Sequence, residues 1–247
     1  MAKKKKEFKV PSRKQPCFKF FKPFWKIFFK RPEVINLAGE IADKAIVVSN
    51  HSAKSGPPCL ELYYPKFTAK WGAYQMLGDF KSRYRYLRDV LYIQKLHKKP
   101  FGSTIKAAIM GVLSPMVYKA MKMMPSYSDG RLMSTIKDSC KILDAGMSVM
   151  VFPEDSNDGY YDVLTQCFPG FVMLAEKYYR ATGEDVPVYP VHYHVKKRVL
   201  VIGKPIYVQD LVKQGLDRYQ IADVYCKAIN KLYYDYVENY QGGKKSK

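Results

Sequence analysis

Two short polar segments hold the residues of this 247-residue sequence that could do chemistry. Asn50 and His51 end one apolar, β-branched run, and Glu154 and Asp155 end another. An imidazole exchanges a proton near neutral pH, and a carboxylate can orient an imidazole or bind hydroxyl groups. Each segment also has a plainer interpretation: a loop histidine often hydrogen-bonds only to backbone, and neighbouring acids often form a solvated turn.

The pattern of apolar residues predicts the elements that position these segments. Apolar runs predict strands at 45–48, 66–71, 148–152, 186–192 and 199–203. Periodic segments predict helices after Pro58, toward Leu77, and at 132–143, 170–180 and 218–237. The alternation favours an α/β fold, a single mixed β-sheet flanked by helices, with its polar loops gathered at one edge.

Charge and cysteine content narrow the partners and the setting. Lys and Arg number 42 against 22 Asp and Glu, a formal charge of +20, which favours nucleic acid, an anionic membrane surface or acidic substrates and carriers. The five cysteines are odd in number and scattered, so they indicate a reducing, intracellular setting and no disulfide framework. His192 and His194 share one face of a strand, but no thiolate or carboxylate adjoins them, and we expect no metal site.

The N-terminal segment 1–34 is basic and aromatic. Over residues 1–32 it has twelve basic residues against the single acid Glu7, and lysines interrupt its aromatic residues from 18 onward. The mixture suits an anionic bilayer interface, whereas the lysines rule out a signal peptide and a spanning helix. A tail that docks onto the domain, or RNA binding, would also explain it. We therefore expect a peripheral or monotopic protein on the cytoplasmic face of a membrane, with a leader at 1–34, a domain at 35–240 and a basic tail at 241–247.

Two further segments remain open on sequence alone. Residues 81–100 read as a basic insertion over one edge of the fold, either a solvated face or a contact with anionic headgroups. Residues 105–125 are apolar but contain lysines and a proline. They predict either a buried amphipathic helix or a helix that lines an acyl-chain groove or dips into a bilayer.

Three motifs, taken in order over about residues 35–205, resemble the lysophospholipid acyltransferase superfamily, which includes glycerophosphate and acylglycerophosphate acyltransferases. The family's N-H-x4-D motif survives as Asn50 and His51, its F-P-E-G-T-R motif as 152–154, and its V-P-V-x-P motif as 186–190. The resemblance implies that His51 is the general base. It would deprotonate an acceptor hydroxyl that attacks the thioester of acyl-CoA or an acyl carrier protein, with no other cofactor.

The sequence departs from the family pattern at three places. Gly56 stands where the aspartate of the first motif belongs. The family's second motif has a phosphate-binding arginine, for which Arg131 is slightly late. In the third motif Asp155 replaces glycine and Asn157 replaces arginine.

The nearest substitutes for the missing groups come from the same two loops. Asp155 could orient His51 in place of the absent aspartate, with Glu61 as a second orienter. The resemblance gives Glu154 an acceptor-binding role, and Asn50, Ser156 and Asn157 join it as predicted substrate-binding residues. Lys54 and Arg131 could hold a phosphate; otherwise the acceptor presents sugar or polyol hydroxyls.

Three functions follow from these residues. The first is a membrane-associated acyltransferase acting on a lysophospholipid, glycerol phosphate or related polar lipid. The second, suggested by Gly56, is an inactive relative that binds lipid or membrane. The third, a nucleic-acid-binding protein, leaves both polar loops unexplained, so we expect no nucleic acid partner.

Overall fold

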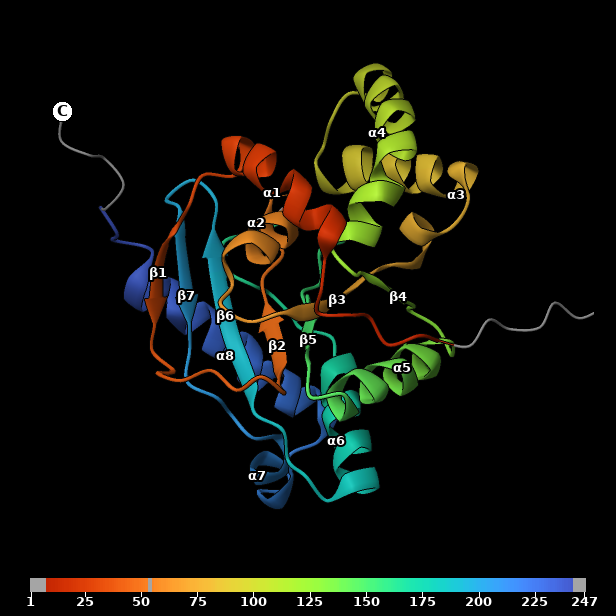
Figure 1. Ribbon diagram of the computed structural model, residues 1–247. Coiled ribbons are helices and arrows are strands. Elements are labelled where there is room, and N and C mark those ends of the chain that lie inside the picture. Colours follow the sequence, from red (N-terminus) through yellow and green to blue (C-terminus); the bar gives the residue numbers. More distant parts are fainter. Residues whose placement is uncertain (1–7, 53–54, 242–247) are drawn as a thin grey trace, which may run out of the picture.

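A seven-stranded mixed sheet forms the centre of the computed structural model, which describes residues 8–52 and 55–241 (Figure 1). The strand order is β1-β7-β6-β2-β5-β3-β4. The strands are β1 (Glu33–Asn36), β2 (Ile46–Ser49), β3 (Thr68–Ala73), β4 (Met124–Ser126), β5 (Ser148–Val151), β6 (Val188–His194) and β7 (Val199–Ile202). The prediction of an α/β fold with one mixed sheet flanked by helices is confirmed.

Strand direction decides where the loops gather. Strands β2, β3, β4, β5 and β6 run parallel to one another, whereas β7 is antiparallel to β6 and β1 is parallel to β7. The carboxyl ends of the five parallel strands therefore lie at one edge of the sheet, where open α/β sheets place their ligands.

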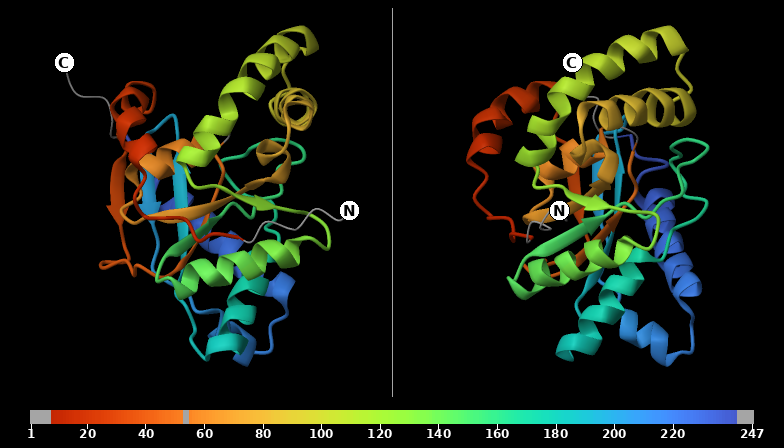
Figure 2. Two further views of the ribbon diagram at one scale, coloured as in Figure 1. Left: turned by 45° about the vertical axis from the view of Figure 1, so that its right-hand side comes forward. Right: turned by 90° about the vertical axis from the view of Figure 1, so that its right-hand side faces the viewer.

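Helices cover both faces of the sheet (Figures 1 and 2). They are α1 (Pro16–Phe28), α2 (Gly56–Tyr63), α3 (Phe80–Arg85), α4 (Pro100–Ala120), α5 (Leu132–Asp144), α6 (Gly170–Thr182), α7 (Val208–Lys213) and α8 (Arg218–Tyr236). A 3-10 turn at Tyr74–Leu77 and a π-helix, η2, at Tyr86–Lys95 lie between β3 and α4. Among the helices at 8–52 and 55–241, none is both long enough and apolar enough to cross a bilayer.

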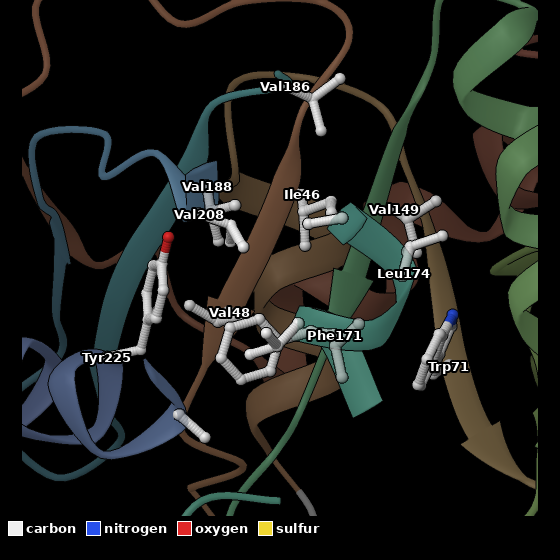
Figure 3. Close-up of a cluster of buried hydrophobic side chains, with 14 of the residues drawn as sticks. Ile46, Val48, Trp71, Val149, Phe171, Leu174, Val186, Val188, Val208 and Tyr225 are labelled. Atoms are coloured by element: carbon white, nitrogen blue, oxygen red, sulfur yellow. The ribbon is translucent and has the colours of Figure 1, made fainter. Parts of the chain in front are cut away.

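Alternation along the buried strands makes two cores. Ile46 and Val48 point to one face, where they pack with Phe171 of α6 and Tyr225 of α8 (Figure 3). Val47 points to the opposite face, in a cluster that includes residues of α2. This two-residue period is what a strand buried on both faces requires, and it fixes the register of β2.

The predicted elements differ from the observed ones at the two edge strands, at several element boundaries, and at 16–28 and 80–95, where helices were not predicted. Strands β1 and β4 were not predicted, because the four residues of β1 are mostly exposed and β4 has only three residues. Strand β3 begins at Thr68, two residues after the predicted start at 66. The helix after the histidine loop begins at Gly56 and not after Pro58. The long C-terminal helix begins as predicted, at Arg218, where Asp217 and Gln220 form a capping box.

Candidate functional site

The two polar loops lie side by side because their strands are neighbours. Strand β2 pairs in parallel with β5, and Val48 lies opposite Val151. Continued three residues past this pair, the register brings His51 to the level of Glu154. The loops predicted to share one sheet edge therefore meet there.

Asn50 fixes the start of the histidine loop. Its side chain is 1% exposed, its Nδ2 donates to the Tyr193 carbonyl at 2.9 Å, and its Oδ1 accepts from the Tyr193 backbone N–H at 2.8 Å. Both the nitrogen and the oxygen of the amide are therefore hydrogen-bonded to the backbone of β6. Asn50 thus holds the histidine loop to β6, and its predicted contact with substrate stays a prediction.

The ring of His51 lies between two aromatic rings. Tyr160 stacks on it, with centroids 4.9 Å apart and planes inclined by 26°, and Phe152 meets it edge-on at 5.1 Å. The residue is partly exposed, so the ring is enclosed from two sides but not buried. Such packing limits the orientations that the imidazole can adopt.

Glu154 is a buried acid beside this histidine. It is 8% exposed, and neither carboxyl oxygen has a hydrogen-bond partner among the described residues. Burial raises the pKa of Glu154 to about 7, while the nearby His51 backbone N–H and the charge of Lys95 partly offset that rise. The group can therefore exchange a proton near neutral pH, and a buried carboxyl without a partner is suited to receive a ligand's hydroxyl.

Lys95 completes the cluster and was missed by sequence reasoning. Its Nζ donates to Ser156 Oγ at 2.6 Å and lies 5.7 Å from the centroid of the Tyr160 ring. Burial lowers the pKa of Lys95, and the charges of Glu154 and Asp155 act in the opposite direction. The sequence marked 81–100 as a basic insertion, but nothing in it distinguishes Lys95 from its neighbours.

The π-helix η2 explains how Lys95 reaches the site. It spans ten residues and ends at Lys95. Runs of this kind are rare and occur often at functional sites. At its end Gln94 donates to the Asn157 carbonyl at 3.1 Å, so the insertion is fastened to the loop after β5.

Tyr160 is the second residue that sequence reasoning missed. Besides stacking on His51 it interacts with the Ser156 side chain, and burial raises its pKa. Ser156 is itself 8% exposed. Ser156 therefore links Lys95 to Tyr160, and Tyr160 links this pair to the imidazole.

Asp155 and Asn157 mainly shape their own loop. Asp155 Oδ1 accepts from the backbone N–H of Asn157 at 3.0 Å, an Asx turn. Asn157 is exposed. The proposed relay from Asp155 to His51 remains a prediction.

Gly56 is held against the backbone of His51. A Cβ atom built on Gly56 would lie 1.9 Å from the His51 carbonyl oxygen. No side chain fits there without moving the loop, so the aspartate of the family motif has no room at this position.

Arg131, one of the two predicted phosphate-binding residues, lies apart from the histidine loop. Arg131 forms a bidentate pair with Asp129 and stacks between the rings of Tyr74 and Tyr127, at 4.5 and 4.4 Å. It follows β4, three strands from β2 along the sheet, a distance of about 14 Å at 4.8 Å per strand. Lys54 lies outside the described residues.

The alternative orienter Glu61 is already engaged. It pairs with Lys70 in a site where both side chains are at most 4% exposed, and it accepts from Gln15 Nε2 at 2.7 Å. These contacts hold α2 to β3 and to the segment before α1. They leave Glu61 as part of the structural framework.

The paired histidines of β6 interact with a loop. His192 Nε2 lies 3.0 Å from the Asp162 carbonyl, and burial lowers the pKa of His192 to about 4. His194 lies at the end of the strand, with its Nδ1 accepting from the Lys197 N–H at 3.0 Å. Within the described part of the chain, no group of three or more His, Cys, Asp or Glu is arranged to hold a metal ion.

The fold and the site define an α/β protein with a histidine and a buried glutamate at the carboxyl ends of neighbouring parallel strands, and the glutamate side chain has no hydrogen-bond partner within 8–52 and 55–241. A comparison with protein-family models finds no match, and neither does one with curated proteins. Among solved structures, the chain is similar to the 1-acyl-sn-glycerophosphate (LPA) acyltransferase of Thermotoga maritima. The sequences are 18% identical, the TM-score is 0.48, and the match covers 87% of this chain and 79% of that one.

Proposed function

We propose that this protein is an acyltransferase that works at a membrane surface and transfers a fatty acyl group to a hydroxyl of a polar lipid. The observation that carries the proposal is the pairing of His51 with Glu154 at adjacent strand ends, where Glu154 is buried and its carboxyl has no partner among the described residues. The order of the three sequence motifs supports the same reaction. The donor is acyl-CoA or an acyl carrier protein, and the acceptor is a lysophospholipid or glycerol phosphate.

In the proposed mechanism the neutral imidazole of His51 takes the proton of the acceptor hydroxyl. The resulting oxygen nucleophile attacks the thioester carbonyl carbon, and a tetrahedral intermediate forms. Its collapse breaks the carbon–sulfur bond, and the departing thiolate takes the proton back from His51. The products are an ester and a free thiol, and His51 returns to its neutral form.

The surrounding residues have distinct parts in this scheme. Phe152 and Tyr160 hold the imidazole plane. Glu154 binds an acceptor hydroxyl, and Lys95 supplies positive charge for an anionic group of the acceptor, a role predicted from sequence for Lys54 and Arg131. Asp155 orients His51; in that case Asp155→Asn abolishes turnover without unfolding the protein, and full activity in this variant would exclude the relay.

Helix α1 supports the membrane location. Phe20, Phe24, Ile27 and Phe28 form one exposed stripe, with Phe20 79% exposed, and lysines flank it. Aromatic and basic side chains in this arrangement suit the headgroup region of an anionic bilayer. An exposed stripe of this size is otherwise unfavourable in water.

The test is release of free thiol from palmitoyl-CoA across a panel of lysophospholipid and glycerol phosphate acceptors. We expect acceptor-dependent release by the wild type and a loss of at least about a hundredfold in His51→Ala, as for removal of a general base. His97→Asn is the matched control, because His97 is exposed and its φ of 49° suits asparagine. Thiol release by His51→Ala at the wild-type rate would refute the mechanism.

A second candidate is an inactive relative that binds lipid, and the crowding at Gly56 favours it. Position 56 has no room for the family's aspartate. Under this alternative the wild type binds vesicles but releases no thiol with any acceptor. The same assay therefore separates the two.

A further inference from the structure

Helix α4 has its small residues inside and its large ones outside. Ser103, Ala107, Gly111 and Ser114 form the buried stripe, which packs against α3 and η2. The fit is close, because a Cβ on Gly111 would lie 3.1 Å from the Phe80 ring. The helix therefore packs on its neighbours through its small side chains, and its opposite face is exposed.

That opposite face is a continuous apolar stripe that is exposed to solvent. It consists of Phe101, Ile105, Ile109, Val112 and Met116, which follow one another at helical spacing. Phe101 is 82% exposed and Val112 67% exposed. Single exposed apolar residues need no explanation, but a contiguous stripe of this length marks an interaction surface.

Charge indicates what covers the stripe. No Asp or Glu occurs between Asp89 and Asp129, a segment that contains six lysines. The segment between Glu7 and Glu33, which contains α1, is likewise free of acids, and it holds eight basic residues beside the exposed apolar stripe of α1. Large apolar side chains that have basic neighbours and no acidic ones suit an anionic lipid surface, because the apolar groups can insert and the basic groups attract the headgroups.

The position of α4 agrees with this occupant. In the views of Figures 1 and 2, α1 and α4 lie at the same end of the molecule, opposite α6 and α7. The carboxyl ends of β2 and β6 point toward that end. A flat surface touching both helices would thus also face the edge of the sheet that carries His51 and Glu154.

We propose that the outward face of α4 inserts into the interfacial region of an anionic bilayer, as a docking element separate from α1. Helix α4 lies in the plane of the membrane, with its five apolar side chains among the acyl chains and Lys106 and Lys119 near the headgroups. This inference does not depend on acyl transfer, because it concerns binding alone.

The experiment is flotation of the full chain with vesicles of phosphatidylcholine alone and of phosphatidylcholine mixed with phosphatidylglycerol. The test variant carries Ile105→Gln, Ile109→Gln and Val112→Gln, all at exposed positions, and leaves α1 intact. The matched control carries Val212→Gln on α7 and Tyr219→Gln in the first turn of α8, both at exposed positions. Helix α7 lies at the opposite end of the molecule from α4 (Figure 1). We expect binding of mixed vesicles to fall at least tenfold in the test variant and to stay at the wild-type level in the control.

A second measurement reports insertion directly. In a Trp25→Phe background the remaining Trp71 is 7% exposed, so Val112→Trp adds a tryptophan whose emission can be followed. We expect its emission to shift to the blue on mixed vesicles and to be quenched by lipids brominated in the acyl chain, whereas Tyr219→Trp shows neither change.

Two results would overturn the inference. One is wild-type vesicle binding by the triple variant. The other is self-association of the wild type without lipid that the triple variant abolishes, because a second copy of the chain would then cover the stripe. A failure of the proposed enzyme activity would change neither vesicle measurement, so the two proposals fail separately.

Discussion

Two glutamate–lysine couples in this domain are built in opposite ways. Glu61 and Lys70 contact each other directly, both are almost completely buried, and Gln15 and Thr68 satisfy their remaining bonds. Glu154 and Lys95 are also close enough for their charges to interact, yet they form no ion pair within 4.0 Å. Lys95 binds a serine hydroxyl instead, and the Glu154 carboxyl has no partner among the described residues.

The difference separates a structural couple from one that is prepared for a ligand. A buried charge is tolerated when it is paired and hydrogen-bonded, as in the first couple. In the second couple the described part of the chain leaves the Glu154 carboxyl without a hydrogen-bond partner, an arrangement whose cost falls when a ligand supplies hydrogen bonds. Substitutions should therefore affect stability in one couple and ligand handling in the other.

The largest expected effect is on stability at the first couple. Glu61→Gln leaves the Lys70 charge buried without its counter-charge, and we expect a loss of about 3–5 kcal/mol in the free energy of unfolding. Urea unfolding measures it. Glu61→Leu combined with Lys70→Met removes both charges and should recover much of the loss; an equally unstable double variant would contradict the pairing argument.

Glu154→Gln should raise the free energy of unfolding, in contrast to Glu61→Gln, and it should do so only at higher pH. The pKa of Glu154 is raised in the folded protein to about 7 from the ordinary 4.5, so the stabilisation from its protonated form is complete below pH 4.5 and is lost as pH rises through 7. Glutamine has no proton to lose, so the variant should equal the wild type near pH 4.5 and exceed it by up to about 3 kcal/mol above pH 8. Urea unfolding from pH 4.5 to 9 gives the difference; a constant offset across this range would show that Glu154 keeps an ordinary pKa.

Restoring the family aspartate should harm the protein, because position 56 touches the His51 backbone. We expect Gly56→Asp to cost about 1–3 kcal/mol of stability, as overpacking does, and to give no gain in thiol release. Gly130→Asp is a suitable control, since a Cβ at Gly130 meets nothing within 4 Å and the residue lies outside α4. Higher thiol release in Gly56→Asp would mean that the loop can open to admit an orienting carboxylate.

The sequence predicted the part of the site that is carried by strands. Apolar runs with a polar end located His51 and Glu154, because parallel neighbours bring their ends together whatever the intervening chain does. It could not predict Lys95, whose position depends on a π-helical insertion that has no signature of its own. Nor could it tell that Asn50 and Glu61 are engaged in structural contacts, because their partners lie 143 and 9 residues away and are set by packing.

The smallest effect should come from Lys95, and it should appear in substrate binding. Lys95→Met keeps the length of the side chain but removes the charge that we assign to the acceptor's anionic group. We expect KM for a phosphate-bearing acceptor to rise about tenfold, or about 1.4 kcal/mol, with a smaller change in kcat. An acceptor that lacks a phosphate should show little change in KM.

Lys98→Met, three residues on and exposed, is the control. Because a purely structural lysine would alter both acceptors alike, an equal rise in KM for the two would place Lys95 with Lys70 among the residues that only support the fold.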